Sequence, residues 1–483
     1  MYVNIGHSED VIAAWQDDAR PEDSATFAGD APQSNARSAD AAALETSGIS
    51  FAAGPAAPAG TMFDSRLSPA PPGAAARAAG ALQGAGAQAS AVPASLGAAG
   101  DTGSAAPRPA VPAPAGFEEP AASLVRERLA DVADEVATDT MGSVRAVLEG
   151  RDAGAPSLML AAHMDEIGLM VTYISDEGFL SVASLGGVDA AILPGMRVDV
   201  HTASGTLRGI VGRKPIHLIE PDERKTVTPL SSLVIDLGMK PKRVKKLVRV
   251  GDPITFGVGF ERFGDDMAVS KCFDDKCGVW VACRVMEKLA LAGRAPGDFI
   301  AVATTQEEIG TRGAMTSAHA VNPDVALAFD VTHATDYPGI DKTKYGKIVC
   351  GAGPVIARGP NINPVVFERL VAAAEAEGVP YQLEAEPSVT GTDARAIQVT
   401  RGGIPTGLIS VPLRYMHTPT EVICLRDLEA TVRLIARFAQ DLAPDTSFVP
   451  GLGGAVTENA EGKAADADAD ADAPDASAAP EEA

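Results

Sequence analysis

The sequence predicts an α/β domain in which a mainly parallel sheet is flanked by helices, with a small β-barrel-like domain inserted into it. Short apolar runs suited to buried strands alternate with helical stretches, as in sheets that are covered on both faces. One Gly-rich stretch breaks this alternation and shows β-like patterning with almost no helical period. Disordered extensions at both ends complete the predicted organisation.

The extensions are recognised by their composition. Residues 1–114 are dominated by Ala, Gly, Pro and Ser, and residues 447–483 contain an Ala-Asp repeat. Such segments cannot bury enough apolar surface to offset their chain entropy, so we expect both to be disordered. Residues 451–483 carry nine acids and one Lys, and residues 1–116 carry eleven acids and five Arg, which leaves ten of the chain's 24 net negative charges on the middle.

The same composition excludes several classes of protein. The middle is only mildly acidic and has no Lys/Arg block with interleaved aromatic residues, so nucleic acid is not an expected partner. No apolar run is long enough for a transmembrane helix, and no secretory signal is visible. The five Cys are an odd number without a CxxC spacing, which argues against a disulfide framework. We therefore expect a cytoplasmic protein that does not bind membranes.

The globular middle divides into segments of distinct pattern. Four apolar runs predict buried strands, at 157–162, 298–305, 324–329 and 405–411. Helical periodicity predicts helices over 277–293, 364–378 and 425–443. The Gly-rich stretch runs from 183 to 263. We accordingly expect a discontinuous α/β domain, 115–182 and 264–446, with a β-rich domain inserted at 183–263.

Potential metal ligands collect where the predicted strands end. They are His163 and Asp165 after the first strand, Glu307 and Glu308 after the second, Asp330 after the third and His417 beyond the fourth. A further acid pair, Asp274 and Asp275, stands directly before the first predicted helix. In open α/β sheets the ligand crevice lies outside the carboxyl ends of the strands. Two His and several carboxylates, without Cys, suit divalent ions such as zinc, cobalt or manganese.

The adjacent acids Glu307 and Glu308 need a positive charge beside them, because neighbouring like charges repel and are hard to desolvate. Two ions roughly 3.5–4 Å apart could share one bridging carboxylate and one bridging water, and each ion would lower the pKa of that water. One glutamate would then bind metal. Its neighbour would remain free to take a proton from the water, because a carboxylate committed to a metal retains little proton affinity.

Five motifs, in the order HMDEIG, FDDKCG, QEEIGTRGA, DVTHATD and RYMHTPTE, resemble those of the TET-type (tetrahedral) glutamyl aminopeptidase family, the dinuclear metallo-aminopeptidases of peptidase clan MH. The segments GGVDAAILPG, GRKPIHLIE and GTDARAIQ are similar to that family as well. The resemblance covers about Gly116 to Ala443. Any one motif alone would be weak evidence, whereas the ordered set is specific.

The resemblance implies a role for each candidate residue. It implies that His163 and Asp330 hold one ion, that Glu308 and His417 hold the other, and that Asp274 bridges the two. Glu307 would be the general base, and Asp165 would orient the imidazole of His163. The choice of Asp274 over Asp275 as the bridge rests on the resemblance alone.

The implied activity is removal of N-terminal residues from short peptides, by a hydroxide that bridges two divalent ions in each subunit. Zinc or cobalt is expected, and manganese also fits. The resemblance further implies that the insert is a dimerisation domain and that dimers assemble into a hollow tetrahedral dodecamer. Two alternatives remain open at this point. One is an endoglucanase-like glycoside hydrolase, which needs two carboxylates and generally no metal pair. The other is a non-catalytic assembly protein.

Two features depart from the family pattern. Lys276 stands where the family usually has Arg, and Lys cannot make the bidentate contact of an Arg. The segment RPAVPAPA, 108–115, replaces the helix that usually precedes the turn Gly116–Pro120. Four further polar residues in or near the motifs could either support the ligands or be structural, namely His217, His333, Asp336 and Asp393.

Overall fold

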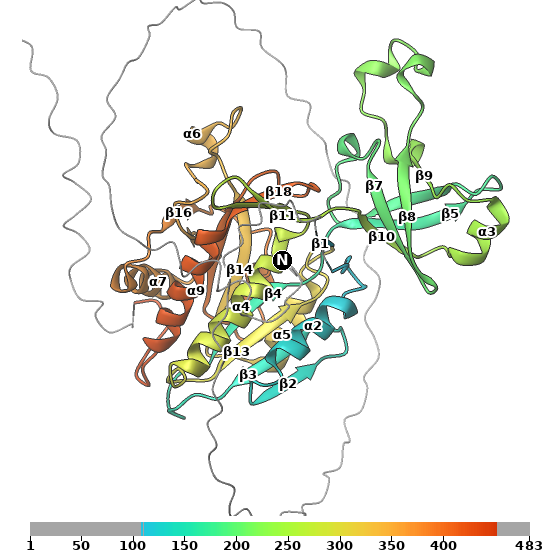
Figure 1. The fold of residues 1–483 in the computed structure, drawn as a ribbon. Helices are drawn as coiled ribbons and strands as arrows, with labels where there is room; N and C mark the ends of the chain where they lie inside the picture. The colour runs from blue at the N-terminus through green and yellow to red at the C-terminus, as the bar shows by residue number, and fades with distance from the viewer. Residues whose placement is uncertain (1–107, 110, 452–483) are drawn as a thin grey trace, which may run out of the picture. The chain divides into compact units, whose positions relative to one another are not determined.

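The computed structural model describes residues 108–109 and 111–451 (Figure 1). The predictions for 1–107, 110 and 452–483 lie outside these described residues. The described part contains an eight-stranded sheet, a closed six-stranded barrel and a small four-stranded sheet. The predicted fold class, a mainly parallel sheet with helices and an inserted barrel, is therefore confirmed. Within the described part, no helix is both long and apolar enough to cross a membrane.

The large sheet has the strand order β16-β15-β17-β14-β4-β13-β3-β2. Its strands are β2 (Glu135–Thr138), β3 (Val144–Leu148), β4 (Leu158–His163), β13 (Phe299–Thr304), β14 (Val325–His333), β15 (Val355–Arg358), β16 (Gln382–Ala385) and β17 (Thr406–Leu413). The four predicted strands form its centre as β17-β14-β4-β13, and neighbouring members of this group all pair in parallel. Their carboxyl ends therefore meet at one edge of the sheet, which is where the candidate ligands follow.

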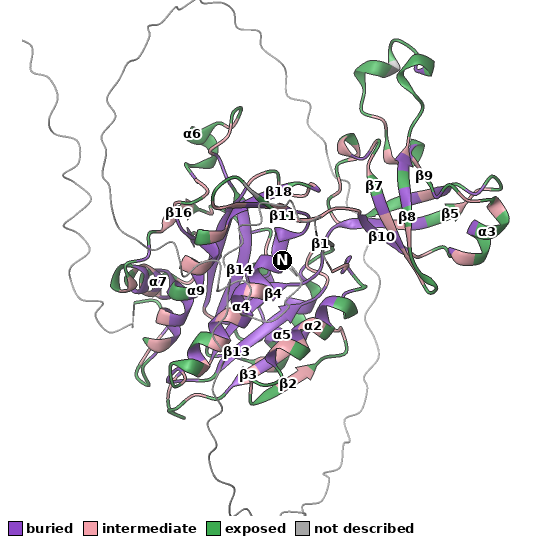
Figure 2. Cartoon of the chain, viewed as in Figure 1, coloured by how far each residue is buried: buried purple, intermediate pink, exposed green. Residues whose placement is uncertain are grey.

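Helices cover this sheet, and its central strands are buried (Figure 2). The helices of the α/β part are α2 (Glu119–Leu129), α4 (Phe273–Leu291), α5 (Arg312–Val321), α6 (Lys342–Tyr345), α7 (Pro364–Glu377), α8 (Ala394–Gln398) and α9 (Leu425–Gln440). Helix α4 packs on β4, β13 and β14, and α9 packs on α4 and α7. The start of α7 is fixed by Asn363, whose side chain accepts from the N–H groups of Val365 and Val366.

The barrel closes in the order β10-β5-β6-β9-β8-β7. Its strands are β5 (Gly168–Ile174), β6 (Leu180–Leu185), β7 (Arg197–Thr202), β8 (Gly205–Gly212), β9 (Val234–Asp236) and β10 (Pro253–Phe256), and α3 (Pro241–Leu247) accompanies them. Inward and outward residues alternate along β7, where Val198 and Val200 are buried and Arg197 is exposed. The barrel strands begin at Gly168, ahead of the expected insert start at 183, and the division of the chain into domains remains our proposal.

The small antiparallel sheet has the order β1-β11-β12-β18 and joins segments that are distant in the sequence. It consists of β1 (Arg108–Pro109), β11 (Gly259–Phe263), β12 (Met267–Ser270) and β18 (Glu421–Cys424). Ser270 pairs with Glu421 in the register of β12 and β18. This pairing brings the start of α4 next to the segment that follows β17.

A buried ion cluster lies between β12 and α4. Glu166 is 2% exposed and forms ion pairs with Lys271 and with Lys276, the latter at 2.7 Å. Lys276 also donates to the carbonyl oxygen of Val111 at 2.8 Å, and the N–H of the fully buried Ala113 donates to Glu166 at 2.8 Å. Burial alone would raise the pKa of Glu166, but the charges of the two lysines outweigh burial and hold that pKa well below its usual range. Part of the segment that replaces the expected helix is therefore ordered by this cluster.

We expect Glu166→Gln to lower the free energy of unfolding by about 3–5 kcal/mol, because it leaves two buried ammonium groups without their carboxylate. Chemical denaturation of the variant and the wild type measures the difference. Glu119→Gln is the matched control, because it removes the partner of Arg126 at a side chain that is 72% exposed. The control should lose less than about 1 kcal/mol. Equal losses in the two variants would contradict the proposed importance of burial.

Candidate functional site

The predicted site residues converge at the carboxyl ends of the central strands. His163 is the last residue of β4 and pairs in register with Thr304, the last residue of β13. Asp330 lies on β14, which is the other neighbour of β4. One cavity of about 490 Å³ is lined by six of the seven predicted residues, namely His163, Asp274, Glu307, Glu308, Asp330 and His417. The parallel strands and the pairing of β12 with β18 together bring into one cavity residues that are up to 254 positions apart in the chain.

The carboxylate of Asp274 lies between two imidazoles. Its Oδ1 is 3.0 Å from Nε2 of His163, and its Oδ2 is 3.2 Å from Nε2 of His417. Nε2 of His417 also lies 3.5 Å from Oε2 of Glu308. Burial raises the pKa of Asp274, but the hydrogen bonds with the two imidazoles outweigh burial and hold it below its usual range. Its neighbour Asp275 accepts the N–H of His163 at 3.3 Å, so the two acids of this pair have different contacts.

Two overlapping groups of ligand atoms result from this arrangement. His163, Asp274 and Asp330 form one group, and Asp274, Glu308 and His417 form the other, with the ligand atoms of each group within 4.8 Å of one another. Imidazole nitrogens and carboxylate oxygens are a donor set that zinc, cobalt and manganese accept. The chemistry of the donors therefore fits two divalent ions that share Asp274.

The electrostatics of the cavity favour cations as well. Burial raises the pKa of Glu307 to about 8, and burial together with the charge of Asp274 raises that of Glu308 to about 9. Burial and the same charge also raise the pKa of Asp330. These shifts come mainly from burial, and the mutual repulsion of the carboxylates adds to it. Positive charge placed among them would relieve that repulsion.

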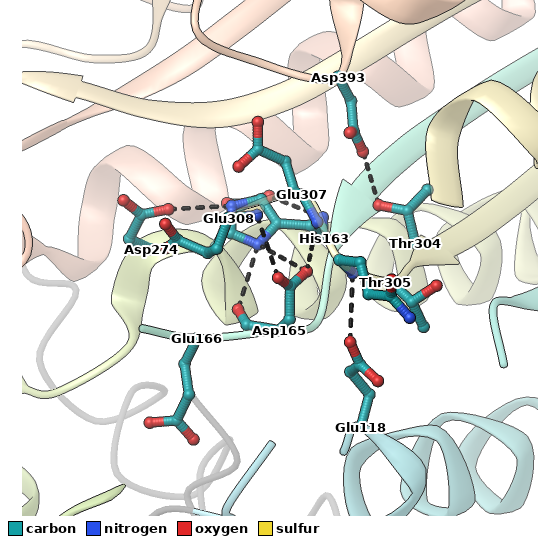
Figure 3. Close-up of polar contacts among 12 residues, drawn as sticks. Glu118, His163, Asp165, Glu166, Asp274, Thr304, Thr305, Glu307, Glu308 and Asp393 are labelled. Atoms are coloured by element: carbon teal, nitrogen blue, oxygen red, sulfur yellow. Dashed lines mark hydrogen bonds and ion pairs between the residues drawn. The ribbon is translucent and has the colours of Figure 1, made fainter. Parts of the chain in front are cut away.

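Asp165 does not line the cavity and is completely buried, and its contacts with neighbouring residues are drawn in Figure 3. Its Oδ1 accepts the N–H of Glu307 at 2.9 Å, and its Oδ2 accepts the N–H of Glu308 at 3.1 Å. Nδ1 of His163 lies 3.1 Å from the carbonyl oxygen of Asp165 and 3.5 Å from its carboxylate. The carboxylate thus fixes the backbone of the two adjacent glutamates, while the closer contact with the imidazole comes from the main chain.

Two buried glutamates near the site were not singled out by the sequence analysis. Glu421 accepts the N–H of His417 at 3.0 Å and the N–H of Asp274 at 3.2 Å. Glu118 accepts the N–H of Gln306 at 3.2 Å (Figure 3). Glu421 is the last residue of the motif RYMHTPTE, and this position in the motif could have marked it as a candidate site residue. Its hydrogen bonds to the main chain leave no pattern in the sequence.

The structure shows the surroundings of the four residues whose roles the sequence left open, His217, His333, Asp336 and Asp393. His333 lines the cavity, whereas His217 lies in the turn η2 (Ile216–Leu218), which follows β8 of the barrel. Asp336 pairs with Arg414 at 2.7 Å. Asp393 is 1% exposed and accepts from the hydroxyl of Thr304 at 2.6 Å, and burial raises its pKa to about 6.

Two glycines allow the chain after β6 to approach the ligands. A Cβ on Gly187 would lie 2.9 Å from Nδ1 of His417, and the carbonyl oxygen of Gly187 is 3.2 Å from the same atom. Gly186 has φ +74°, and a Cβ there would lie 2.8 Å from Ile167 and 3.2 Å from Glu308. The GG of GGVDAAILPG is therefore required by close approach to two candidate ligands.

Comparisons with known proteins identify the family. A family model described as M42 glutamyl aminopeptidase matches residues 142–434. The lysyl aminopeptidase of Pyrococcus furiosus is 36% identical over 332 residues, which are 68% of this chain and 92% of that protein. The TET aminopeptidase structure from Thaumarchaeota archaeon SCGC AB-539-E09 superposes with a TM-score of 0.65 at 35% identity, covering 68% of this chain and 93% of that one. The Pyrococcus horikoshii TET1 peptidase can assemble into a tetrahedron or a large octahedral shell. Its structure superposes with a TM-score of 0.61 at 31% identity, covering 69% of this chain and 97% of that one.

We expect Gly187→Ala to weaken binding of one of two divalent ions about 10–100-fold, because the new methyl group displaces the ring of His417 and leaves His163 in place. Calorimetric titration of the metal-free protein with zinc resolves the two binding steps. Gly402→Ala is the control, because a Cβ at Gly402 meets open space. Unchanged zinc binding in Gly187→Ala would show that the close approach has no effect on the ligand.

Proposed function

This chain belongs to the M42 glutamyl aminopeptidase family and is an aminopeptidase, and we propose that it removes single residues from the N-termini of short peptides with two divalent ions. The observation that carries the proposal is the position of Asp274, whose two carboxylate oxygens each face a different imidazole. A carboxylate in that position is suited to bridging two cations. The remaining ligands lie on either side of it.

In this proposal one ion is held by His163, Asp274 and Asp330, and the other by Asp274, Glu308 and His417. Zinc or cobalt is the proposed metal, and manganese suits the same donors. When bound, such ions supply Lewis acidity, which lowers the pKa of a water molecule and polarises the carbonyl group of the scissile peptide bond.

Glu307 is the proposed general base. It lines the cavity but belongs to neither ligand group, so its carboxylate is free to exchange a proton. Its carboxylate can take a proton from water and hold it until the leaving amine needs it. Asp165 holds the N–H of Glu307 and thereby fixes where that carboxylate can reach. The proton passes to the amine nitrogen as the C–N bond breaks.

Assembly is proposed from the relatives. The Pyrococcus horikoshii relative forms closed shells, and this chain contains the six-stranded barrel that would serve as its dimerisation domain. Dimers and a dodecamer are the assemblies we propose. The mass of the protein in solution tests this directly, and a monomer would contradict it.

We expect Glu307→Gln to lower kcat for an aminoacyl fluorogenic substrate by about 10²–10⁴-fold, because the amide cannot accept the proton. Both zinc ions should still bind with wild-type affinity, since Glu307 holds neither. The measurements are kcat and calorimetric zinc titration of the same preparation. Glu127→Gln, on an exposed position of α2, is the control for the substitution itself.

Two results would contradict this mechanism. The first is normal turnover by Glu307→Gln. The second is wild-type activity that survives complete removal of metal by a chelator and does not respond when zinc or cobalt is added back. Metal-independent hydrolysis of a glycoside would instead favour the glycosidase alternative.

We also propose that the enzyme prefers basic N-terminal residues. Glu384 and Glu386 line the same cavity as the ligands, and the hydroxyl of Thr332, two residues beyond Asp330 on β14, donates to Glu384 at 2.7 Å. Within the described residues, neither glutamate forms an ion pair with Lys or Arg. Arg395 is the opposing charge of this cavity, and it is exposed. The lysyl aminopeptidase relative acts on a residue of the matching charge.

We expect lysyl and arginyl substrates to have higher kcat/KM than leucyl and glutamyl ones. The double variant Glu384→Gln, Glu386→Gln should lose about tenfold or more on the lysyl substrate and little on the leucyl one, since a hydrogen bond to a charged group is worth about 1.5–3 kcal/mol. Arg395→Gln, which removes the opposite charge, is the control and should spare the lysyl substrate. Equal losses on all substrates would mean that the glutamates bind the α-ammonium group, and would refute the proposed preference.

A further inference from the structure

We propose that Glu421 is a positioning residue that holds ligands of both metal ions through their main-chain N–H groups, an inference that rests on the proposed metal pair. Glu421 is the first residue of β18 and is 2% exposed. Its Oε1 accepts from the N–H of His417 at 3.0 Å, and its Oε2 accepts from the N–H of Asp274 at 3.2 Å. One carboxylate thus connects a ligand of the second ion with the bridge between the two ions.

The segments that meet at Glu421 come from different parts of the chain. Asp274 follows β12 by four residues, and Ser270 of β12 pairs in register with Glu421. His417 precedes Glu421 by four residues and has φ +60°, a left-handed conformation that is uncommon for a residue with a side chain. The hydrogen bond from its N–H to Glu421 stabilises this turn. The position of Glu421 is itself fixed by the pairing of β18 with β12.

The two hydrogen bonds made by the side chain of Glu421 require a carboxylate. Two N–H donors approach, one to each oxygen, and the two oxygens of a carboxylate can each accept one of them. The amide of Gln would offer one acceptor and would turn its NH₂ group toward the second donor. Within the described residues, Glu421 has no Lys or Arg ion-pair partner. Its carboxylate accepts hydrogen bonds from the N–H groups of the two proposed ligands instead.

Glu421 should affect both ions because Asp274 belongs to both ligand groups. Gly187 differs in this respect, since its close approach concerns His417 alone. Asp165 provides a corresponding contact for other residues of the site, where it holds the N–H groups of Glu307 and Glu308. The pattern of loss across the two zinc-binding steps therefore distinguishes Glu421 from a residue that merely supports one ligand.

The experiment titrates metal-free Glu421→Gln protein with zinc by calorimetry and records the visible spectrum of the cobalt-loaded form. We expect both zinc steps to weaken by about 10–100-fold and the cobalt bands to change. Glu118→Gln is the matched control, because Glu118 is 5% exposed and accepts the N–H groups of Gly116 and Gln306, neither of which is a proposed ligand. Its zinc binding should stay close to that of the wild type.

The outcomes separate the inference from the proposed function. Zinc binding of wild-type strength in Glu421→Gln would overturn the inference even if the variant unfolded at a lower temperature, and so would a loss confined to one step. Fewer than two zinc ions on the wild-type protein would overturn the metal pair itself. If Glu421→Gln does not fold, Glu421→Asp provides the same test, since it keeps the charge but is too short to reach both donors. Unaltered zinc steps in that variant would overturn the inference.

Discussion

The structure depends on holding several carboxylates together in one buried place where they repel each other. Asp274, Glu308 and Asp330 share a cavity with Glu307, and burial raises the pKa of all four carboxylates. At Asp274 alone, the hydrogen bonds with two imidazoles outweigh burial and hold the pKa below its usual range. The free energy needed to keep these groups together comes from the rest of the fold. A parallel centre with a fixed register and helices packed on its buried strands provides that rigidity.

A second buried charge cluster, formed by Glu166, Lys271 and Lys276, lies next to the acidic cavity at the start of α4. Lys276 is two residues beyond Asp274 and pairs with Glu166, so one short segment is anchored in the acidic cavity and in the basic cluster. Lys276 stands where the family resemblance leads us to expect Arg, and its contacts show which interactions a Lys makes there. Its ammonium group meets Glu166 and the carbonyl oxygen of Val111 as separate point contacts, and no bidentate geometry is needed. The same contacts order part of the segment that stands in place of the expected helix.

The sequence predicted what depends on side-chain type and missed what depends on the main chain. The four central strands were predictable because buried strands are continuous apolar runs, and His163, Glu307, Glu308 and Asp330 were candidates because they stand where those runs end. The choice of Asp274 over Asp275 rested on the family resemblance alone. Glu421 and the carboxylate contacts of Asp165 were not predictable, because a hydrogen bond to a backbone N–H depends on the path of another segment. Gly187 was quoted within a motif, but its contact with His417 requires the path of the chain after β6.

The contacts with the main chain explain how separate segments can form one precise site. The proposed ligands come from β4, from the start of α4, from the turn after β13, from β14 and from the segment after β17. Asp165 fixes the turn after β13, and Glu421 fixes the other two segments that do not lie on strands. Asp330 needs no such partner, because it lies within β14 itself. Since all these bonds join protein groups, they position the proposed ligands without a cation, and less of the binding energy of a cation would be spent on ordering them.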